Sequence, residues 1–162
     1  MIQRANGISI YYEKEGSGKP MILLHGNGED HTTFSEATSI LKDRFTIYAL
    51  DTRGHGRSSG SCDMHYSAFA EDVKAFIDAL SIEKPAVLGF SDGAITALML
   101  AYSYPDSVSA VISAGANTRP ESLTDEMLKD IRREYEATGS ALLSLMLSEP
   151  DISKEDLGRI TV

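Results

Sequence analysis

The stretch Gly-Phe-Ser-Asp-Gly at residues 89–93 constrains the fold of this chain more than any other feature. Residues 85–88, directly before it, form a short apolar run that predicts a buried strand. Residues 94–102, directly after it, are rich in alanine and leucine and predict a helix. The chain must therefore pass from a strand to a helix through a sharp turn with Ser91 at its apex.

The pattern G-x-S-x-G at a strand-to-helix turn is known as a nucleophile elbow. Gly89 and Gly93 fit it because the turn is too sharp for side chains that would meet the neighbouring strand and helix. We expect Ser91 to have unusual backbone dihedral angles and to lie close to the positive end of the following helix. The alternative is an ordinary strand-to-helix turn that contains a serine, but the flanking segments favour the elbow.

A serine nucleophile needs a base, normally a histidine that a carboxylate holds in place. All four histidines of this chain, His25, His31, His55 and His65, precede Ser91, and none follows it. We expect none of them to form the hydrogen bond of a catalytic base with Ser91.

Composition excludes several classes of function. The formal net charge is −9 without a strong basic cluster, which disfavours nucleic acids and anionic membranes as partners. No apolar run approaches the length of a membrane span, and the N-terminus has no apolar signal region. The single cysteine, Cys62, lies in a polar loop and indicates a surface thiol in a cytoplasmic protein. The sequence has no metal-binding or cofactor-binding motif, so we expect neither a metal nor a cofactor.

Strand and helix patterns alternate along the first 116 residues. The expected strands are residues 2–5, 8–13, 21–24, 45–50, 85–88 and 108–114, and the expected helices are 33–41, 66–80 and 94–102. Asn6-Gly7 between the first two strands predicts a hairpin. This order predicts an α/β fold whose mainly parallel sheet carries helices on both faces and an antiparallel hairpin at one edge.

The pattern changes after residue 116, since two helices are expected at 124–137 and 140–147 with no strand between them. We therefore divide the chain into a core at 1–116, a helical cap segment at 117–150, and residues 151–162. The last segment contains a short expected helix at 153–157 and then Ile160-Thr161-Val162, which we interpret as the approach to another core strand.

Three motifs follow successive expected strands: His25-Gly26-Asn27-Gly28, the run from Asp51 to Ser58, and the serine motif at 89–93. With these motifs in this order, the chain resembles the α/β-hydrolase fold family, particularly its small soluble esterase-like members. The resemblance covers nearly the whole chain. A serine at position 91 disfavours dehalogenases and epoxide hydrolases, because those members of the fold carry an aspartate there.

The resemblance implies roles for individual residues. The backbone N–H groups of Asn27 and Asp92 would form the oxyanion hole. His25 and Gly26 would brace and shape the oxyanion loop. Asp51, Arg53 and Gly54 would form a structural turn. The side chain of Asp92 is expected to cap its own helix.

The resemblance also implies what should follow. In the family, the acid and the histidine of the triad come from loops after later strands, so the chain resembles the N-terminal two-thirds of such a hydrolase, truncated before the last strands. The strand at 108–114 would then expose one edge, and we expect a C-terminal fragment or self-association to cover it.

The functional hypothesis is a serine hydrolase that acts on a small-molecule ester, thioester, amide or C–C bond through Ser91, and that is catalytically incomplete in this chain. A second hypothesis is a non-catalytic, hydrolase-like binding or interaction fragment. A third is that activity appears only on assembly with a complementary fragment.

Overall fold

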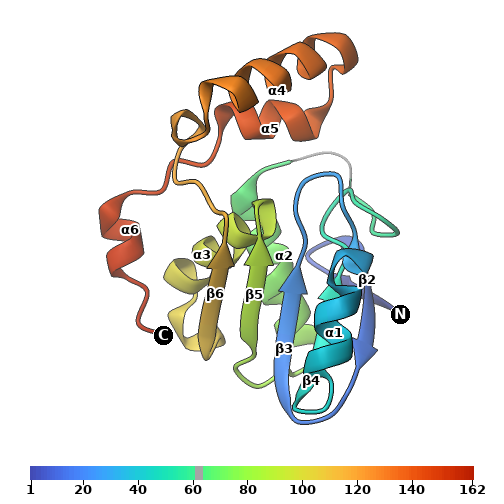
Figure 1. Ribbon diagram of the computed structural model, residues 1–162. Helices are drawn as coiled ribbons and strands as arrows, with labels where there is room; N and C mark the ends of the chain where they lie inside the picture. The colour runs from blue at the N-terminus through green and yellow to red at the C-terminus, as the bar shows by residue number, and fades with distance from the viewer. Residues whose placement is uncertain (61–63) are drawn as a thin grey trace.

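A six-stranded sheet forms the centre of the computed structural model, which describes residues 1–60 and 64–162 (Figure 1). The strands are β1 (Ile2–Ala5), β2 (Ile8–Glu15), β3 (Lys19–Leu24), β4 (Phe45–Leu50), β5 (Ala86–Phe90) and β6 (Ala110–Ala114). Their order across the sheet is β1-β2-β4-β3-β5-β6. The prediction for Cys62 lies outside the described residues.

The pairing within the sheet confirms the predicted mixed architecture. Strands β3, β4, β5 and β6 run parallel, whereas β1 and β2 pair antiparallel with each other and β2 pairs antiparallel with β4. The hairpin turns at Asn6 and Gly7, whose φ angles are +46° and +76°, as a two-residue hairpin turn requires. The parallel strands end together, so the loops that follow β3, β4 and β5 meet at one edge of the sheet.

Helices cover both faces of this sheet. On one face lie α2 (Tyr66–Ala79) and α3 (Asp92–Ser103), which pack against each other and bury the larger hydrophobic core. On the other face lie a short 3-10 helix, η1 (His31–Phe34), and α1 (Ser35–Leu41), which cover a smaller core over β3 and β4. No helix in the described part of the chain is both long and apolar enough to cross a membrane.

Most of the segment after β6 forms a layer above the carboxyl ends of the parallel strands, whereas its last part descends beside the sheet (Figure 1). This segment contains a 3-10 helix, η3 (Pro120–Ser122), and the helices α4 (Asp125–Thr138), α5 (Ala141–Ser148) and α6 (Lys154–Gly158). Another 3-10 helix, η2 (Pro105–Ser107), lies between α3 and β6. Helices α4 and α5 pack against each other, and α6 lies beside α3. The residues after α6 have no strand assignment in this structure.

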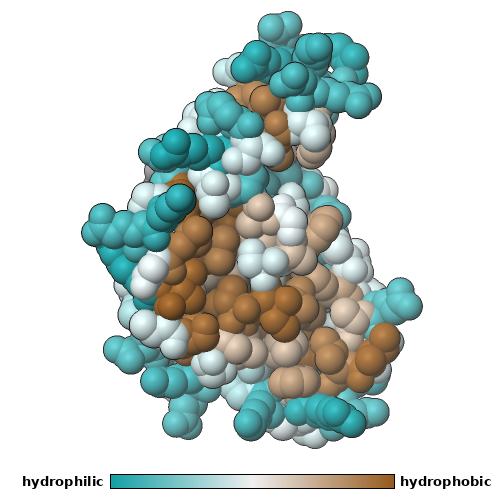
Figure 2. Space-filling model, turned by 60° about the vertical axis from the view of Figure 1, so that its left-hand side comes forward, coloured by the Kyte–Doolittle hydropathy of each residue, from teal (hydrophilic) through white to brown (hydrophobic). Residues whose placement is uncertain are grey.

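Strand β6 forms one edge of the sheet, since it pairs with β5 alone among the described strands. On the face that carries α1, Leu88 of β5 lies opposite Ile112 of β6, and none of the described helices covers this part of the sheet. Ile112 is 49% exposed and Phe90 is 43% exposed. Figure 2 shows hydrophobic surface gathered on the side of the molecule that carries β6.

Candidate active site

Ser91 lies at the turn between β5, which ends at Phe90, and α3, which begins at Asp92. Its φ and ψ angles are +51° and −116°. A residue other than glycine rarely adopts such angles, which cost on the order of 1–3 kcal/mol. The predicted strained serine at a strand-to-helix turn is therefore confirmed.

Hydrogen bonds hold the Ser91 backbone from both sides. Its N–H donates to the carbonyl oxygen of Ala114 at 2.9 Å, which ties the turn to the end of β6. Its carbonyl oxygen accepts from the N–H groups of Ala94 and Ile95, at 2.9 and 3.1 Å, and so begins α3. The neighbouring strand and the helix together maintain the strained conformation.

The two glycines of the motif allow the backbone to pass through very crowded positions. A Cβ atom on Gly93 would lie 2.0 Å from the carbonyl oxygen of Leu24 in β3. A Cβ atom on Gly89 would lie 2.1 Å from the carbonyl oxygen of Gly93. In both cases the atom that the Cβ would meet belongs to the backbone, so no side chain can move aside to make room. The packing of α3 on β3 and β5 therefore requires glycine at both positions.

The loop after β3 lies directly against Ser91. A Cβ atom on Gly26 would be 3.2 Å from the Cβ atom of Ser91. The side-chain amide Nδ2 of Asn27 donates a hydrogen bond to Oδ2 of Asp92 at 3.0 Å. Asn27 and Asp92, the two residues that the resemblance assigns to an oxyanion hole, thus lie together beside the serine. A hydrogen bond between their side chains joins them.

Asp92 is only 4% exposed, and burial raises the pKa of its carboxyl group. Hydrogen bonds from Asn27 and from the hydroxyl of Tyr66 act in the opposite direction. Burial also raises the pKa of Tyr66, with the charge of Asp92 as the second cause. The expectation that the Asp92 side chain caps α3 is wrong. Asp92 is already the first helical residue, and its carboxylate accepts from Asn27 and Tyr66 instead.

His25 is 1% exposed, and its hydrogen bonds define its protonation state. The N–H of Thr52 can only donate, and it lies 3.0 Å from Nε2 of His25. That nitrogen is therefore unprotonated, and Nδ1 donates to the carbonyl oxygen of Gly26 at 2.8 Å. Burial lowers the pKa of His25, which favours this neutral form. His25 thus joins the loop after β3 to the loop after β4.

Asp51 is fully buried at the end of β4 and joins three backbone segments. Its carboxylate accepts from the N–H groups of His31 and Arg57, both at 2.8 Å, and from Nδ1 of His31 at 2.6 Å. Ligand atoms of Asp30, His31 and Asp51 lie within 4.8 Å of one another, a spacing that a metal ion could use. The hydrogen bond to Asp51 already occupies Nδ1 of His31, so this cluster acts as a brace between loops.

Arg53 and Gly54 continue the turn after β4. The guanidinium of Arg53 donates two hydrogen bonds to the carboxylate of Asp72 in α2, at 2.8 and 2.7 Å. Asp72 also accepts from Nδ2 of Asn6, at 2.8 Å, so one buried carboxylate connects this turn, the hairpin and α2.

The remaining histidines also point to partners other than Ser91. His55 is buried with Nδ1 beside the carbonyl oxygen of Arg53, and His65 pairs with Glu149. Within residues 1–60 and 64–162, no histidine forms a hydrogen bond with Ser91, as predicted.

Sequence reasoning missed three contributors to the site. Tyr66 supplies a hydroxyl to Asp92, Glu29 accepts from the N–H of Gly26 at 2.9 Å, and the carbonyl oxygen of Leu142 in α5 lies 3.5 Å from Nδ2 of Asn27. Each approaches from a different segment, and no motif marks these positions. A tyrosine at the start of an amphipathic helix resembles any other core residue in the sequence.

Comparison with known proteins gives the family. The model of the α/beta hydrolase fold family matches residues 19–144, which include the serine turn, the loop after β3 and most of the helical segment. The chain belongs to the α/β-hydrolase fold family.

Individual relatives agree with this assignment. The human serine hydrolase BPHL is 34% identical over 152 residues, an alignment that covers 86% of this chain and 52% of that protein. Zearalenone hydrolase of Bionectria ochroleuca is 30% identical, covering 91% of this chain and 57% of that protein. A thermophilic esterase from Thermogutta terrifontis superimposes with a TM-score of 0.71 at 27% identity, covering 84% of this chain and 50% of that one. The chain thus spans about half the length of the curated relatives it matches.

Proposed function

We propose that this chain carries the nucleophile and the oxyanion hole of a serine hydrolase. The strained Ser91 at the start of α3 is the observation that carries the proposal. Its hydroxyl oxygen would attack the carbonyl carbon of a small ester, thioester, amide or C–C substrate, and its proton would pass through the base to the leaving group, which departs as an acyl-enzyme forms. Water would then release the acyl group and restore the serine.

The N–H groups of Asn27 and Asp92 would stabilise the negative oxygen of the tetrahedral intermediate. Asp92 opens α3, and the first N–H groups of a helix have no acceptor within that helix. The N–H of Asn27 donates to no acceptor among the described residues. Each donor of this kind contributes roughly 10²- to 10³-fold to turnover in other serine hydrolases.

The segment at 117–150 would act as a partial cap over the substrate. Its helix α5 is almost wholly apolar, Leu145 is 2% exposed, and the carbonyl oxygen of Leu142 reaches Asn27. An apolar helix beside the oxyanion loop favours a small hydrophobic acyl group. The base and the acid would come from polypeptide that this sequence does not include, because no histidine of the described residues forms a hydrogen bond with Ser91.

The lack of a hydrogen bond between any described histidine and Ser91 also favours a second candidate function, that of a binding fragment without catalysis. A fluorophosphonate probe distinguishes the two, because its rate of bonding rises with the activation of the serine, and the elbow and oxyanion hole alone would activate Ser91 weakly. We expect slow labelling at Ser91, detected by intact mass and peptide mapping, with none in Ser91→Ala. The matched control Ser148→Ala, which changes an exposed serine of α5, should label like the wild type. An unlabelled wild type would support the binding fragment, and equal labelling of Ser91→Ala would contradict the nucleophile assignment.

We also propose that a further strand covers the β6 edge and the apolar face around Ile112. A C-terminal fragment or a second copy could supply it. Support comes from the unpaired outer side of β6 among the described strands and from the exposure of Ile112 beside Leu88.

The 162-residue chain alone is therefore expected to associate or to be poorly soluble, as measured by size-exclusion chromatography with light scattering. The variant Ile112→Lys should shift it toward monomer, because a charge on an edge strand opposes pairing. Ile40→Lys, at a 69% exposed position of α1, is the matched control and should leave association unchanged. A monodisperse wild-type monomer would contradict this proposal.

A further inference from the structure

The side chain of Asn27 connects three segments beside Ser91. Its Nδ2 atom donates to Oδ2 of Asp92 in α3 at 3.0 Å and lies 3.5 Å from the carbonyl oxygen of Leu142 in α5. A side-chain amide carries two N–H groups, so Asn27 can serve both acceptors at once. The loop at residues 25–28 is thereby joined to the serine helix and to the cap segment.

The backbone around Asn27 has little else to hold it. The hydrogen bonds within this loop join Gly26 to Glu29, and none of those among the described residues uses the backbone of Asn27 or Gly28. Gly28 has a φ of +71°, and a Cβ atom there would meet nothing within 4 Å. Because glycine backbones have wide conformational freedom, the side chain of Asn27 is the anchor that sets the direction of its N–H.

Tyr66, the first residue of α2, holds Asp92 from the other side. The hydroxyl of Tyr66 donates to the carboxylate of Asp92, and both residues are buried. Burial raises the pKa of Tyr66, so its hydroxyl keeps the proton that it donates. The carboxylate of Asp92 therefore lies between a rigid donor on α2 and the amide of Asn27.

The backbone of Tyr66 contacts the cap segment as well. Its N–H donates to Oε2 of Glu149 at 3.1 Å, and Glu149 is the residue at which α5 ends. The side chain of His65 also pairs with Glu149. Helix α5 thus meets the core at two places, at Leu142 through Asn27 and at Glu149 through Tyr66. Tyr66 belongs to both connections, because its hydroxyl reaches Asn27 through Asp92.

We propose that Tyr66 is a positioning residue for the oxyanion hole. Its hydroxyl orients the carboxylate of Asp92, which holds the side chain of Asn27 so that the backbone N–H of Asn27 faces the substrate oxygen. A poorly aligned donor is much weaker, so this alignment affects the rate. Because the N–H of Tyr66 binds Glu149, docking of α5 and alignment of the donor depend on each other. The role rests on the proposed function, in which Asn27 is an oxyanion donor.

The test compares fluorophosphonate labelling of Ser91 in the 162-residue chain with that in Tyr66→Phe and Asn27→Ala. Both variants retain the two backbone N–H groups of the oxyanion hole and remove one connection between Tyr66 and the loop. We expect each to slow labelling about tenfold, less than the roughly 10²- to 10³-fold loss of a whole donor. The double variant should be no slower than the slower single variant, because the two residues act in series.

A spectroscopic measurement separates positioning from a general loss of structure. In the phosphonylated wild type, the amide protons of Asn27 and Asp92 should both move downfield as they bind the phosphoryl oxygen. In Tyr66→Phe the change at Asn27 should fall by about half or more, because its N–H is no longer aligned. The change at Asp92 should persist, because α3 fixes that N–H. Glu149→Ala, which releases the end of α5, should also reduce the change at Asn27.

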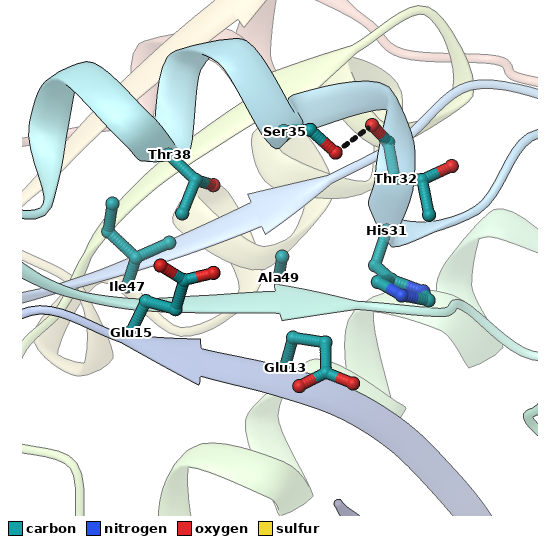
Figure 3. Close-up of a pocket in the computed structure, with 8 residues that line it drawn as sticks. All are labelled: Glu13, Glu15, His31, Thr32, Ser35, Thr38, Ile47 and Ala49. Atoms are coloured by element: carbon teal, nitrogen blue, oxygen red, sulfur yellow. Dashed lines mark hydrogen bonds between the residues drawn. The ribbon is translucent and has the colours of Figure 1, made fainter.

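The controls lie elsewhere in the molecule. Between α1 and strands β2 and β4 is a cavity of about 270 Å³, and none of its lining residues belongs to the serine turn or to the loop at residues 25–28 (Figure 3). There the hydroxyl of Ser35 donates to the carbonyl oxygen of Thr32 at 2.7 Å. Ser35→Ala removes that hydrogen bond, and Tyr48→Phe removes a hydroxyl from a buried tyrosine of β4. Neither should change labelling or the amide shifts.

Labelling of Tyr66→Phe at the wild-type rate would overturn the proposal, as would equal losses of the shift changes at Asn27 and Asp92. Thermal melts confirm that each variant is folded. A wild type that does not label contradicts the proposed hydrolase instead. NMR order parameters of residues 26–29 in the free chain then decide the positioning role, since Tyr66→Phe should lower them and Tyr48→Phe should not. A loop that is equally ordered in both variants would overturn it.

Discussion

Replacing Gly93 by alanine is expected to lower the free energy of unfolding by about 3–5 kcal/mol, a large part of the total stability of a domain this size. The added Cβ atom would lie 2.0 Å from the carbonyl oxygen of Leu24 and 2.7 Å from that of His25. Both contacts are with backbone, so α3 would have to move away from β3. That movement would also displace Ser91 and Asp92 from the loop after β3.

Urea unfolding measures the stability loss, and fluorophosphonate labelling measures the displacement of Ser91. Gly158→Ala is the matched control, because a Cβ atom there meets nothing within 4 Å and the residue lies in α6. Its stability should stay the same or rise slightly, since alanine favours helix over glycine by up to about 1 kcal/mol. If Gly93→Ala unfolds like Gly158→Ala, the close packing of α3 on β3 is wrong.

Local patterns were sufficient to predict the fold. Apolar runs predicted the four parallel strands β3 to β6, as at Phe45–Leu50, because strands inside a parallel sheet are covered on their faces and are therefore nearly continuously apolar. The hairpin followed from Asn6-Gly7 and the serine turn from its two glycines, because few residues tolerate those backbone conformations. These features depend on neighbours along the chain, which a sequence displays directly.

The contacts of the site could not be predicted in this way. The partners of Asp92 are Asn27, 65 residues earlier, and Tyr66 in another helix. The cap assigned to Asp92 was wrong for the same reason, since a helix-starting aspartate has the same sequence pattern whether it faces its own helix or a neighbouring loop.

Arg53 and Asp72 form the charge pair whose loss should be most costly. Their side chains are 8% and 5% exposed, and the contact is bidentate. Arg53→Met should lower the free energy of unfolding by about 3–5 kcal/mol, because a buried carboxylate loses its cation. Asp72→Leu should cost a similar amount, because it leaves the cation of Arg53 buried without this carboxylate and removes the acceptor of Asn6.

The double variant Arg53→Met with Asp72→Leu should lose less than the sum of the two single variants, by roughly 2–3 kcal/mol, since neither charge then remains buried. Lys74 and Asp78 on the same helix α2 provide the control. Their closest contact is 2.6 Å, but Asp78 is 62% exposed, so Lys74→Met should cost less than about 1 kcal/mol. Because the two pairs have similar contact distances, any difference between their costs in stability is due to burial. If Arg53→Met cost as little as Lys74→Met, Arg53 would not be the residue that holds the turn after β4, and with it the hairpin, against α2.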